Sequence, residues 1–557
     1  MVVLAVDLKN GTFTEREWKG ESSPLECALS LQSEYGEESL VIGSVAEEKT
    51  GDGAASIFPV VYHSEISGKR EIAALTSSHG YSLLRLGIKA LVITGRADKL
   101  RYITLSPSKR EILPSENMRA ESSSSFESVV TAPGEIALTT GIAADKGVWY
   151  GALQCGGRNV PGLGLGHAFF SHNLKSVVLT AFSDGGQERK SEAPQKRIRN
   201  TFMEGLRTYG EYSIIPSSSR LGWTPVYNYS DRFDPRVANI DGRSLAERYG
   251  NYPDGCRGCF LSCLRRTRDG DALPRWTDLL YLGPNIGIFD LANIRKIYNA
   301  AVSSGLEIPT LGGLLAYILS LPQGERSLYL RDGSVENITA FISRLSTGSV
   351  LPKGLVSLPD AVQGYDHRPV LYDVRGAFAE ALLLSQGLDF TLPGTLFFPK
   401  RSVNAECAAV FALYETVYTL ALMSLGCSPF TAFVEYFSRL PDIVFRVPLL
   451  ARFALKRFTA YGYKAGELLE TGYRLLEKLG LEWHEIPRCF TFNSVSSYDA
   501  ATVPLKKLQS RYDEEKLRML ISLKSSRAKR AKKDGVKSAN AAPSEDRGSD
   551  ADPGLSR

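Results

Sequence analysis

The sequence lacks the features that mark membrane and exported proteins. Its longest apolar stretch, residues 407–430, is interrupted by Glu415 and ends in Gly-Cys-Ser-Pro before Phe430. A membrane-spanning helix needs about 20 predominantly apolar residues, so we expect this stretch to form a buried helix instead. The N-terminus, Met-Val-Val-Leu-Ala-Val-Asp-Leu, has neither the basic start nor the small-residue cleavage site of a signal peptide. We therefore expect a cytoplasmic protein with no membrane partner.

The chain also has little net charge outside its C-terminal end. The formal charge of the 557 residues is +5, but from Lys524 onward nine Lys or Arg face five Asp or Glu, which leaves +1 for the rest. This balance does not indicate a nucleic-acid partner. The run at residues 524–533 could contact RNA or acidic lipid, although such runs are more often solvated. Because it has almost nothing to bury, we expect residues 524–557 to be a disordered basic and polar tail.

Histidine is scarce, and the cysteines are too few for a disulfide framework. The chain has six His and eight Cys, and no His lies between His172 and His367. Eight cysteines in a chain of this length do not form a disulfide scaffold. Most of them are scattered, but Cys256, Cys259 and Cys263 form a C-x2-C-x3-C motif.

This motif indicates a metal centre. The spacings allow one tight loop to direct three thiolates at a single iron–sulfur cubane, and Gly258 and Ser262 permit the close approach. The charge of the thiolates would be offset by Arg257, Arg265 and Arg266. A cubane needs four ligands, so a distant cysteine must complete it. Two alternatives stay open, a zinc site, which usually has a second cysteine pair or a His, and three unrelated buried thiols.

The distribution of apolar residues predicts an α+β fold, with a β-rich N-terminal domain followed by mainly helical domains. Up to about Thr180, short β-rich runs alternate with Gly, Ser and Asn turns. The polar stretch at residues 184–194 is the expected boundary, and beyond it apolar residues recur at three- and four-residue spacing. We expect a β-rich domain at residues 1–185 and a helical domain with the cysteine loop at residues 196–390. A helical C-terminal domain should follow at residues 391–523.

The cysteine motif and six further segments together resemble the aldehyde:ferredoxin oxidoreductase family. Leu282-Gly-Pro-Asn-Ile-Gly-Ile follows the cysteines as Leu-Gly-x-Asn-Leu-Gly-Ile does in that family, and Pro225-Val-Tyr-Asn-Tyr precedes them as Pro-Thr-x-Asn-Phe does. The other matching segments occur in the family's order and are residues 6–11, 84–97, 162–178 and 364–377. The resemblance covers roughly residues 1–500.

The resemblance implies a fold, two cofactors and a set of site residues. Members of the family carry a [4Fe-4S] cluster and a tungsten-bispterin, and they oxidise aldehydes with ferredoxin as the electron acceptor. For this chain the resemblance implies a [4Fe-4S] cluster and a bispterin with tungsten or molybdenum. In the family the fourth cysteine ligand of the cluster follows a long helix, and Cys427 has that position in this chain. Cys407 and Cys489 are expected to be ordinary buried thiols. The pterin-facing positions fall on Gly164, Gly166, Asn228 and Asn285. Implied partners are a ferredoxin-like protein, a small aldehyde or other carbonyl substrate and, as one option, a second copy in a homodimer.

The same alignment also places substitutions at the family's active site. The glycine-rich turn that cradles pterin phosphates becomes residues 25–33, which contain no glycine. The Gly-Arg pair before Gly-x-Gly becomes Pro161-Gly162, although Arg158 is close by. Two pterin-binding aspartates fall on Val302 and Leu422. The catalytic Glu and His fall on Thr277 and Phe390, and a threonine and a phenylalanine cannot replace their acid–base chemistry.

Three other residues could take part in this site. Asp278 and Glu307 could replace the lost acid–base groups, although surface carboxylates are the commoner case. His167 could face the pterin, although a structural histidine is the commoner case.

Two hypotheses follow. The first is a divergent oxidoreductase that retains a tungsten- or molybdenum-pterin and acts on an aldehyde or another small carbonyl compound. The second is a paralogue that has lost the pterin and keeps the cluster as an electron relay or structural staple.

Overall fold

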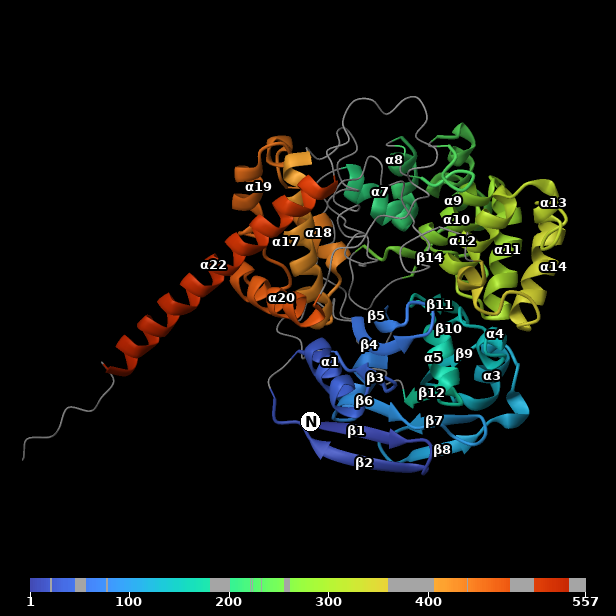
Figure 1. The fold of residues 1–557 in the computed structure, drawn as a ribbon, viewed down its shortest axis with the longest axis horizontal. Coiled ribbons are helices and arrows are strands. Elements are labelled where there is room, and N and C mark those ends of the chain that lie inside the picture. The colour runs from blue at the N-terminus through green and yellow to red at the C-terminus, as the bar shows by residue number, and fades with distance from the viewer. Residues whose placement is uncertain are drawn as a thin grey trace, which may run out of the picture.

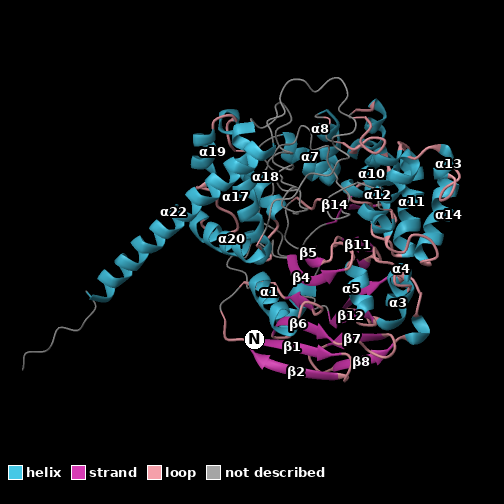
Figure 2. Ribbon diagram, viewed as in Figure 1, coloured by secondary structure: helices cyan, strands magenta, loops and turns pink. Residues whose placement is uncertain are grey.

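The computed structural model describes residues 1–20, 23–45, 57–76, 79–180, 201–220, 222, 224–231, 233–254, 261–358, 405–437, 439–480 and 505–539. A β-rich region built from the N-terminal part of the chain lies below two groups of helices in Figure 1. Coloured by secondary structure, strands fill the lower region and helices the upper ones (Figure 2). The α+β class expected from the sequence is therefore confirmed. The expected domain boundaries near residues 184–194 and 390 lie outside the described residues.

Two six-stranded sheets form the N-terminal region. The strand order of the first sheet is β2-β1-β6-β3-β4-β5. Its strands β1 and β6 are parallel, and all other neighbouring strands are antiparallel. In the second, with order β11-β10-β9-β12-β7-β8, β12 and β7 are parallel and the other neighbours antiparallel. The strands are β1 (Val2–Asp7), β2 (Thr12–Glu17), β3 (Leu40–Gly43), β4 (Ile57–Ser64), β5 (Lys69–Thr76), β6 (Ile88–Thr94), β7 (Arg101–Leu105), β8 (Arg110–Pro114), β9 (Glu135–Thr140), β10 (Leu153–Cys155), β11 (Arg158–Val160) and β12 (Leu174–Thr180).

The inner strands β1, β3, β4 and β6 of the first sheet are covered on both faces, which explains their nearly continuous apolar sequences. On β1, Leu4 and Val6 belong to a core that also contains residues of the second sheet. Val3 and Ala5 point to the opposite face and pack in a core with helices α1 (Pro24–Tyr35) and α17 (Ala405–Ser424). The remaining helices of this region are α2 (His79–Arg85), α3 (Ser123–Val130), α4 (Ile142–Asp145) and α5 (Leu165–Ser171).

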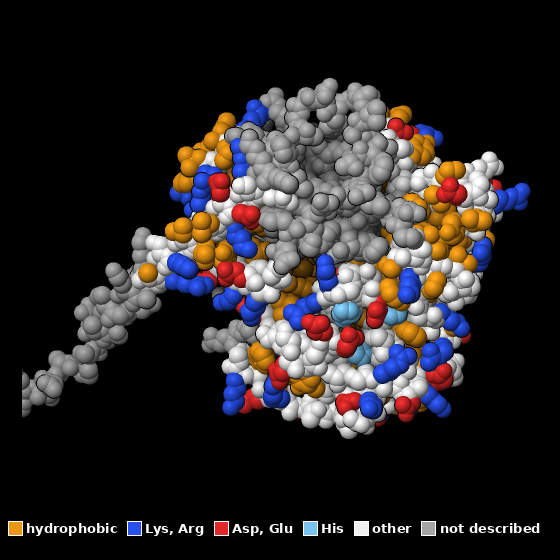
Figure 3. Space-filling model, viewed as in Figure 1, with side chains coloured by type: hydrophobic (Ala, Val, Ile, Leu, Met, Phe, Trp, Pro, Cys, Tyr) orange, Lys and Arg blue, Asp and Glu red, His pale blue; other side chains and the backbone are white. Residues whose placement is uncertain are grey.

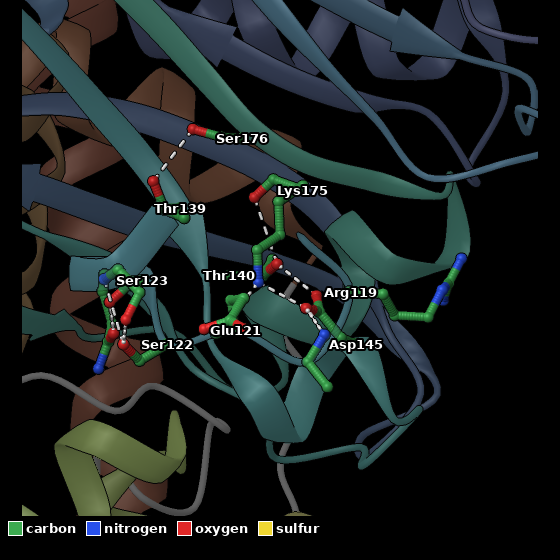
Figure 4. Close-up of polar contacts among 12 residues, drawn as sticks. Arg119, Glu121, Ser122, Ser123, Thr139, Thr140, Asp145, Lys175 and Ser176 are labelled. Atoms are coloured by element: carbon green, nitrogen blue, oxygen red, sulfur yellow. Dashed lines mark hydrogen bonds and ion pairs between the residues drawn. The ribbon is translucent and has the colours of Figure 1, made fainter. Parts of the chain in front are cut away.

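A buried ion pair holds the second sheet to the loops beside it. Lys175 on β12 and Asp145 on α4 form the pair, and their side chains are 0% and 2% exposed. Asp145 also accepts hydrogen bonds from the Thr140 hydroxyl at 2.8 Å and the Ala120 amide at 3.0 Å. Lys175 donates to the Glu121 carbonyl at 3.0 Å. Figure 4 shows that the two charged groups meet in the middle of this cluster.

One group of helices packs around a core that includes the ends of α10, α11 and α12. This group consists of α7 (Thr201–Tyr209), α8 (Ile215–Arg220), α9 (Gly242–Tyr249), α10 (Trp276–Leu282), α11 (Leu291–Ser304), α12 (Ile308–Ser320), α13 (Gln323–Arg326) and α14 (Val335–Ser346).

The second group surrounds α17, the helix expected from residues 407–430. Its other members are α18 (Pro429–Phe437), α19 (Pro448–Leu455), α20 (Ala465–Leu479) and α22 (Leu505–Ala539). The buried carboxylate of Glu26 on α1 accepts a hydrogen bond from Arg474 on α20 at 2.6 Å, which links this group to the first sheet. Within the described residues, no helix combines the length and apolar character needed to cross a bilayer.

The C-terminal end differs from the expectation. Disorder was expected from residue 524 onward, but α22 continues as a helix to Ala539 and projects from the molecule (Figure 1). Lys, Arg and Ala have high helix propensity, so the segment can extend a helix that is already anchored by buried Tyr512 and Met519. Residues 540–557 lie outside the described residues.

Candidate functional site

The flanks of the cysteine loop form a short hairpin beside the second sheet. Strands β13 (Tyr252–Asp254) and β14 (Leu264–Arg266) pair antiparallel on either side of the loop. Arg158 on β11 forms an ion pair with Asp254 and donates to the Arg265 carbonyl at 2.8 Å. Arg266 also pairs with Asp254, at 2.9 Å. The hairpin is therefore fastened to the β-rich region by Arg158.

Arg265 ties the second flank of the loop to α7. Its side chain is almost fully buried, and its guanidinium donates to the carbonyls of Ser262, Leu264, Leu206 and Arg207. Burial lowers the pKa of Arg265, while the neighbouring Cys263 opposes that shift. A cation held beside a cysteine stabilises a thiolate. The charge-offsetting role of Arg265 toward the thiolates stays a prediction.

The structure describes two of the four predicted cluster ligands. Cys263 is partly exposed, and its carbonyl accepts a hydrogen bond from the Glu211 amide at 3.0 Å. Gly210, at φ +66°, allows this contact, because a Cβ there would lie 2.3 Å from the Cys263 carbonyl oxygen. Cys256 and Cys259 lie outside the described residues.

Cys427 lies in a different core from the cysteine loop. It is 5% exposed, follows the end of α17, and packs with α17 and α18, whereas Leu261 beside the loop belongs to the core around α10. Its Sγ lies 3.7 Å from the Leu425 carbonyl oxygen. In the described part of the chain no group of three or more His, Cys, Asp or Glu could hold a metal ion. The four-cysteine set therefore stays a prediction. Of the two other cysteines considered, Cys407 is fully buried in α17 and Cys489 is not described.

Two carboxyl groups bracket the first turn of α10, next to the cysteine loop. The Glu211 carboxylate accepts from the Trp276 amide at 2.8 Å, and the Asp278 carboxylate accepts from the Arg275 amide at 3.0 Å. Burial raises the pKa of Asp278 to about 6, although Arg275 partly opposes the shift. Glu211 keeps some accessible surface, but the surrounding protein raises its pKa to about 7 by the same cause.

Thr277, the residue predicted to replace the family's catalytic Glu, lies in the first turn of α10, next to Asp278 in the chain. Its side chain is partly exposed, and the neighbouring Asp278 is 8% exposed. Glu307 is 5% exposed and accepts from the Thr310 hydroxyl at 2.6 Å, so it anchors the start of α12. The expectation that Asp278 and Glu307 are surface carboxylates is therefore wrong. Phe390 lies outside the described residues.

Asn228 and Asn285, both predicted to face a cofactor, are brought together by a strained turn. Tyr227, Asn228 and Tyr229 all have positive φ, at 46°, 56° and 64°. The turn is held by hydrogen bonds from the Tyr227 amide to the Pro284 carbonyl at 2.9 Å and from the Asn228 amide to the Asn285 carbonyl at 2.8 Å. Consecutive left-handed non-glycine residues cost about 1–3 kcal/mol each and concentrate at functional sites.

The side-chain oxygens of this asparagine pair are unsatisfied. The Oδ1 atoms of Asn228 and Asn285 are buried and have no hydrogen-bond partner among the described residues. The same is true of the Nε atoms of Arg158 and Arg275. Buried polar groups without partners are rare in folded proteins and often await a ligand or water. These atoms fit a polar ligand near α10.

The predicted glycines have a packing role. A Cβ on Gly166 would lie 2.4 Å from the Gly151 carbonyl oxygen, so this glycine lets α5 approach the chain before β10. Gly164 has φ +71° at the start of α5. His167 on the same helix has ring contacts with Trp149 and Phe170, and burial lowers its pKa to about 4. A neutral, aromatic-packed histidine is what a structural role predicts.

Three positions predicted to correspond to pterin-binding positions of the family are described by the structure. Residues 25–33 lie within α1, whose amides are engaged along the helix, and Leu25 and Leu29 are buried. The Val302 carbonyl accepts a hydrogen bond from the side-chain Nε2 of Gln154 at 2.6 Å. Leu422 is buried inside α17. These residues do not fit a phosphate cradle or a pair of pterin-binding carboxylates.

Glu211 and Arg275 were missed by sequence reasoning. Glu211 lies in a short 3-10 helix (Gly210–Ile214) and its carboxylate contacts a helix that begins 65 positions later, so no local pattern identifies it. The only feature of the sequence that pointed to Asp278 is that it follows Thr277 directly in the chain.

Known proteins share both halves of this architecture. Residues 37–181 match the family model "Aldehyde ferredoxin oxidoreductase, N-terminal domain", and residues 190–351 match "Aldehyde ferredoxin oxidoreductase, domains 2 & 3". Together these matches cover just over half of the chain.

Curated relatives include the tungsten-containing aldehyde ferredoxin oxidoreductases of Pyrococcus furiosus and Pyrococcus horikoshii. The first is 24% identical over 309 residues, 51% of this chain and 50% of the relative. The second is 23% identical over 371 residues, 58% of this chain and 60% of the relative. The chain thus matches only about half to three fifths of the length of these relatives.

A solved structure has the same fold over nearly the whole chain. It is the active site complex BamBC of benzoyl coenzyme A reductase bound to 1,5-dienoyl-CoA, with a TM-score of 0.68 and 12% sequence identity. The match covers 92% of this chain and 94% of the other.

Proposed function

Because the chain belongs to the aldehyde ferredoxin oxidoreductase family, we propose that it is an iron–sulfur oxidoreductase with an eroded tungsten-pterin site. In this proposal Cys256, Cys259, Cys263 and Cys427 hold a [4Fe-4S] cluster. Such a cluster supplies one-electron transfer when bound. The chain's own residues orient the loop, with Arg158 and Arg265 fastening its flanks.

The observation that carries the proposal is the replacement of the pterin cradle by α1. In the family this segment is a glycine turn whose amides face phosphates, whereas here it is a helix with buried Leu25 and Leu29. Thr277 supports the same conclusion, since a threonine does not act as a base near neutral pH. Losing positioned acid–base help typically lowers a rate by about a hundred- to ten-thousand-fold. Aldehyde oxidation at the family's rate is therefore not expected.

The charged groups near α10 indicate what a remaining activity would use. Asp278 is the buried carboxyl group next to the lost family position, and its pKa of about 6 lets it exchange a proton near neutral pH. We propose Asp278 as the acid–base group for an oxidoreductase reaction on a small carbonyl compound. A ferredoxin-like protein is the proposed electron partner.

A second candidate function is retained tungsten-pterin chemistry. It is favoured by the tungsten-containing relatives and by the unsatisfied Oδ1 atoms of Asn228 and Asn285, which a polar ligand would satisfy. The third candidate is a non-catalytic paralogue, which uses the cluster as an electron relay or structural staple and binds no pterin.

A metal assay of anaerobically purified protein separates the proposed function from retained tungsten-pterin chemistry. We expect about four irons per chain and no stoichiometric tungsten or molybdenum. Aldehyde-dependent reduction of a viologen dye should be weak or absent even when the cluster is intact and reducible. Stoichiometric tungsten with brisk dye reduction would return the chain to full family chemistry. Iron below one atom per chain would contradict the cluster itself.

A further inference from the structure

An exposed apolar surface lies on α19 and α22. The described chain has thirteen large hydrophobic residues that are exposed, and six of them gather here. Leu449 is 69% exposed, Phe453 54%, Leu517 58% and Ile521 59%. Together with Ile443 and Leu450 these residues are called the α19–α22 surface. Such a concentration of protruding apolar side chains marks a docking site more often than a scatter of single residues does.

The two helices hold this surface in a fixed arrangement. Leu449 and Phe453 are four residues apart on α19, and Leu517 and Ile521 are four apart on α22, so each pair shares one face of its helix. Arg452 on α19 donates from Nε to the Glu515 carboxylate on α22 at 2.8 Å, and Glu515 is 5% exposed. This ion pair joins the helices directly beside the apolar side chains.

Positive charge predominates around the apolar side chains, and the exposed acidic residues there are Asp513 and Glu514, one turn before Leu517. Lys456 and Arg457 are exposed directly after the end of α19, and the Arg457 guanidinium lies 3.7 Å from the centroid of the Phe453 ring. Beyond Ile521, α22 continues to Ala539 with seven Lys or Arg and one Asp in residues 524–539. In Figure 3, orange and blue side chains lie together on the left of the molecule, where α22 leaves it.

We propose that the α19–α22 surface and the basic end of α22 dock on an anionic lipid surface. Apolar side chains enter the boundary between headgroups and acyl chains, while Lys and Arg remain at the anionic headgroups. The helical segment at residues 524–539 adds seven Lys or Arg to the sequence over about 24 Å of helix, and a flat lipid surface can contact this segment and the α19–α22 surface at once. A second copy of the chain is a poorer occupant, because it would bring two basic rims together. This contact is peripheral and does not depend on the proposed redox function.

The test is sedimentation of the full-length protein with vesicles. We expect binding to vesicles of phosphatidylglycerol and phosphatidylcholine, no binding to phosphatidylcholine alone, and loss of binding at about 1 M salt, where screening is nearly complete. L449Q/F453Q should lower the affinity at least about tenfold, because partial burial of two large side chains is lost. The matched control is V129Q/L328Q, which changes residues 69% and 74% exposed elsewhere and should leave binding unchanged.

Charge reversal tests the second half of the surface. K529E/K533E should lower the affinity at least about tenfold, since each nearby cation contributes about 1 kcal/mol to binding an anionic membrane. K19E/K109E, at lysines that are 84% and 67% exposed on the β-rich region, is the control and should bind normally.

Several outcomes would overturn the proposal. One is an absence of binding to the anionic vesicles, and another is full binding by L449Q/F453Q, which would leave the basic segment as the sole determinant. Loss of a dimer in that variant would assign the surface to a second copy of the chain. Binding to polyglutamate but not to vesicles would assign it to an acidic protein.

Discussion

The buried polar contacts around Lys175 and those around α10 use similar residues but differ in how completely they are satisfied. Both carboxylate oxygens of Asp145 accept hydrogen bonds, and Lys175 donates to a carboxylate and a carbonyl. Around α10, by contrast, the Nε atoms of Arg158 and Arg275 have no partner in the described part of the chain. The Oδ1 atoms of Asn228 and Asn285 also have no hydrogen-bond partner among the described residues.

This difference separates a structural cluster from a candidate site. A fully satisfied buried pair is stable by itself, because each charge already has its partners. An unsatisfied buried group costs about 1–3 kcal/mol and persists where a ligand or a functional constraint compensates. The Lys175 cluster is therefore expected to be complete without a cofactor, whereas the unsatisfied groups near α10 are expected to depend on one. Each of the following experiments tests one side of that contrast.

The largest effect is expected at the cysteine loop. Replacing Cys263 with Ser should remove the cluster, because serine is a poor ligand for iron in this setting. The iron content and the visible absorbance of anaerobically purified protein measure the loss. Cys407→Ser is the control, since Cys407 is fully buried inside α17 and should not affect iron. A full iron complement in the Cys263 variant would contradict the proposed ligand set.

A large effect on folding is expected at the satisfied cluster. Lys175→Met leaves the buried Asp145 carboxylate without its cation, which should lower the free energy of unfolding by about 3–5 kcal/mol. Urea unfolding measures this change, and K175M/D145L should recover part of the loss because no buried charge remains. Iron per folded chain should stay the same in both variants. If iron falls with stability, the two regions are not independent.

The fold was more predictable than the site because its signals are local. Strands such as β6 and the buried helix α17 are visible as runs and spacings of apolar residues within one segment. The prediction failed at α22, where low hydrophobicity was taken as disorder although Lys, Ala and Arg also favour helices.

The site depends on contacts between distant segments. Glu211 meets Trp276, Arg158 meets Asp254 and Arg265, and Asn228 meets the carbonyl of Asn285. No spacing rule connects such residues, so the sequence could identify the cysteine motif and Thr277 but not Glu211. The burial of Asp278 could likewise not be predicted from the sequence, because the residues that cover it belong to other elements.

A moderate, pH-dependent effect is expected at Asp278. Its pKa is raised to about 6 by burial, compared with about 4 in an unfolded chain. The unfolded state therefore loses its proton first as pH rises, and stability should fall between about pH 4 and 6 and then level off. The contribution is about 1–3 kcal/mol, and Asp278→Asn should remove this part of the pH dependence. Urea unfolding from pH 4 to 8 measures it, and an unchanged slope in the variant would show that Asp278 does not titrate there.

The smallest effect is expected from a change that keeps the charge of Arg158. Arg158→Lys retains a cation near Asp254 but cannot also donate to the Arg265 carbonyl, because a lysine lacks the planar fork of the guanidinium. The free energy of unfolding should fall by about 1 kcal/mol, the usual contribution of one hydrogen bond. Arg110→Lys is the matched control, since Arg110 pairs with Glu15 on the surface of the β-rich region and such pairs contribute about 0–1 kcal/mol. Equal losses at the two positions would mean that Arg158 is an ordinary surface cation, and the contrast between the two regions would then lose its link to the cysteine loop.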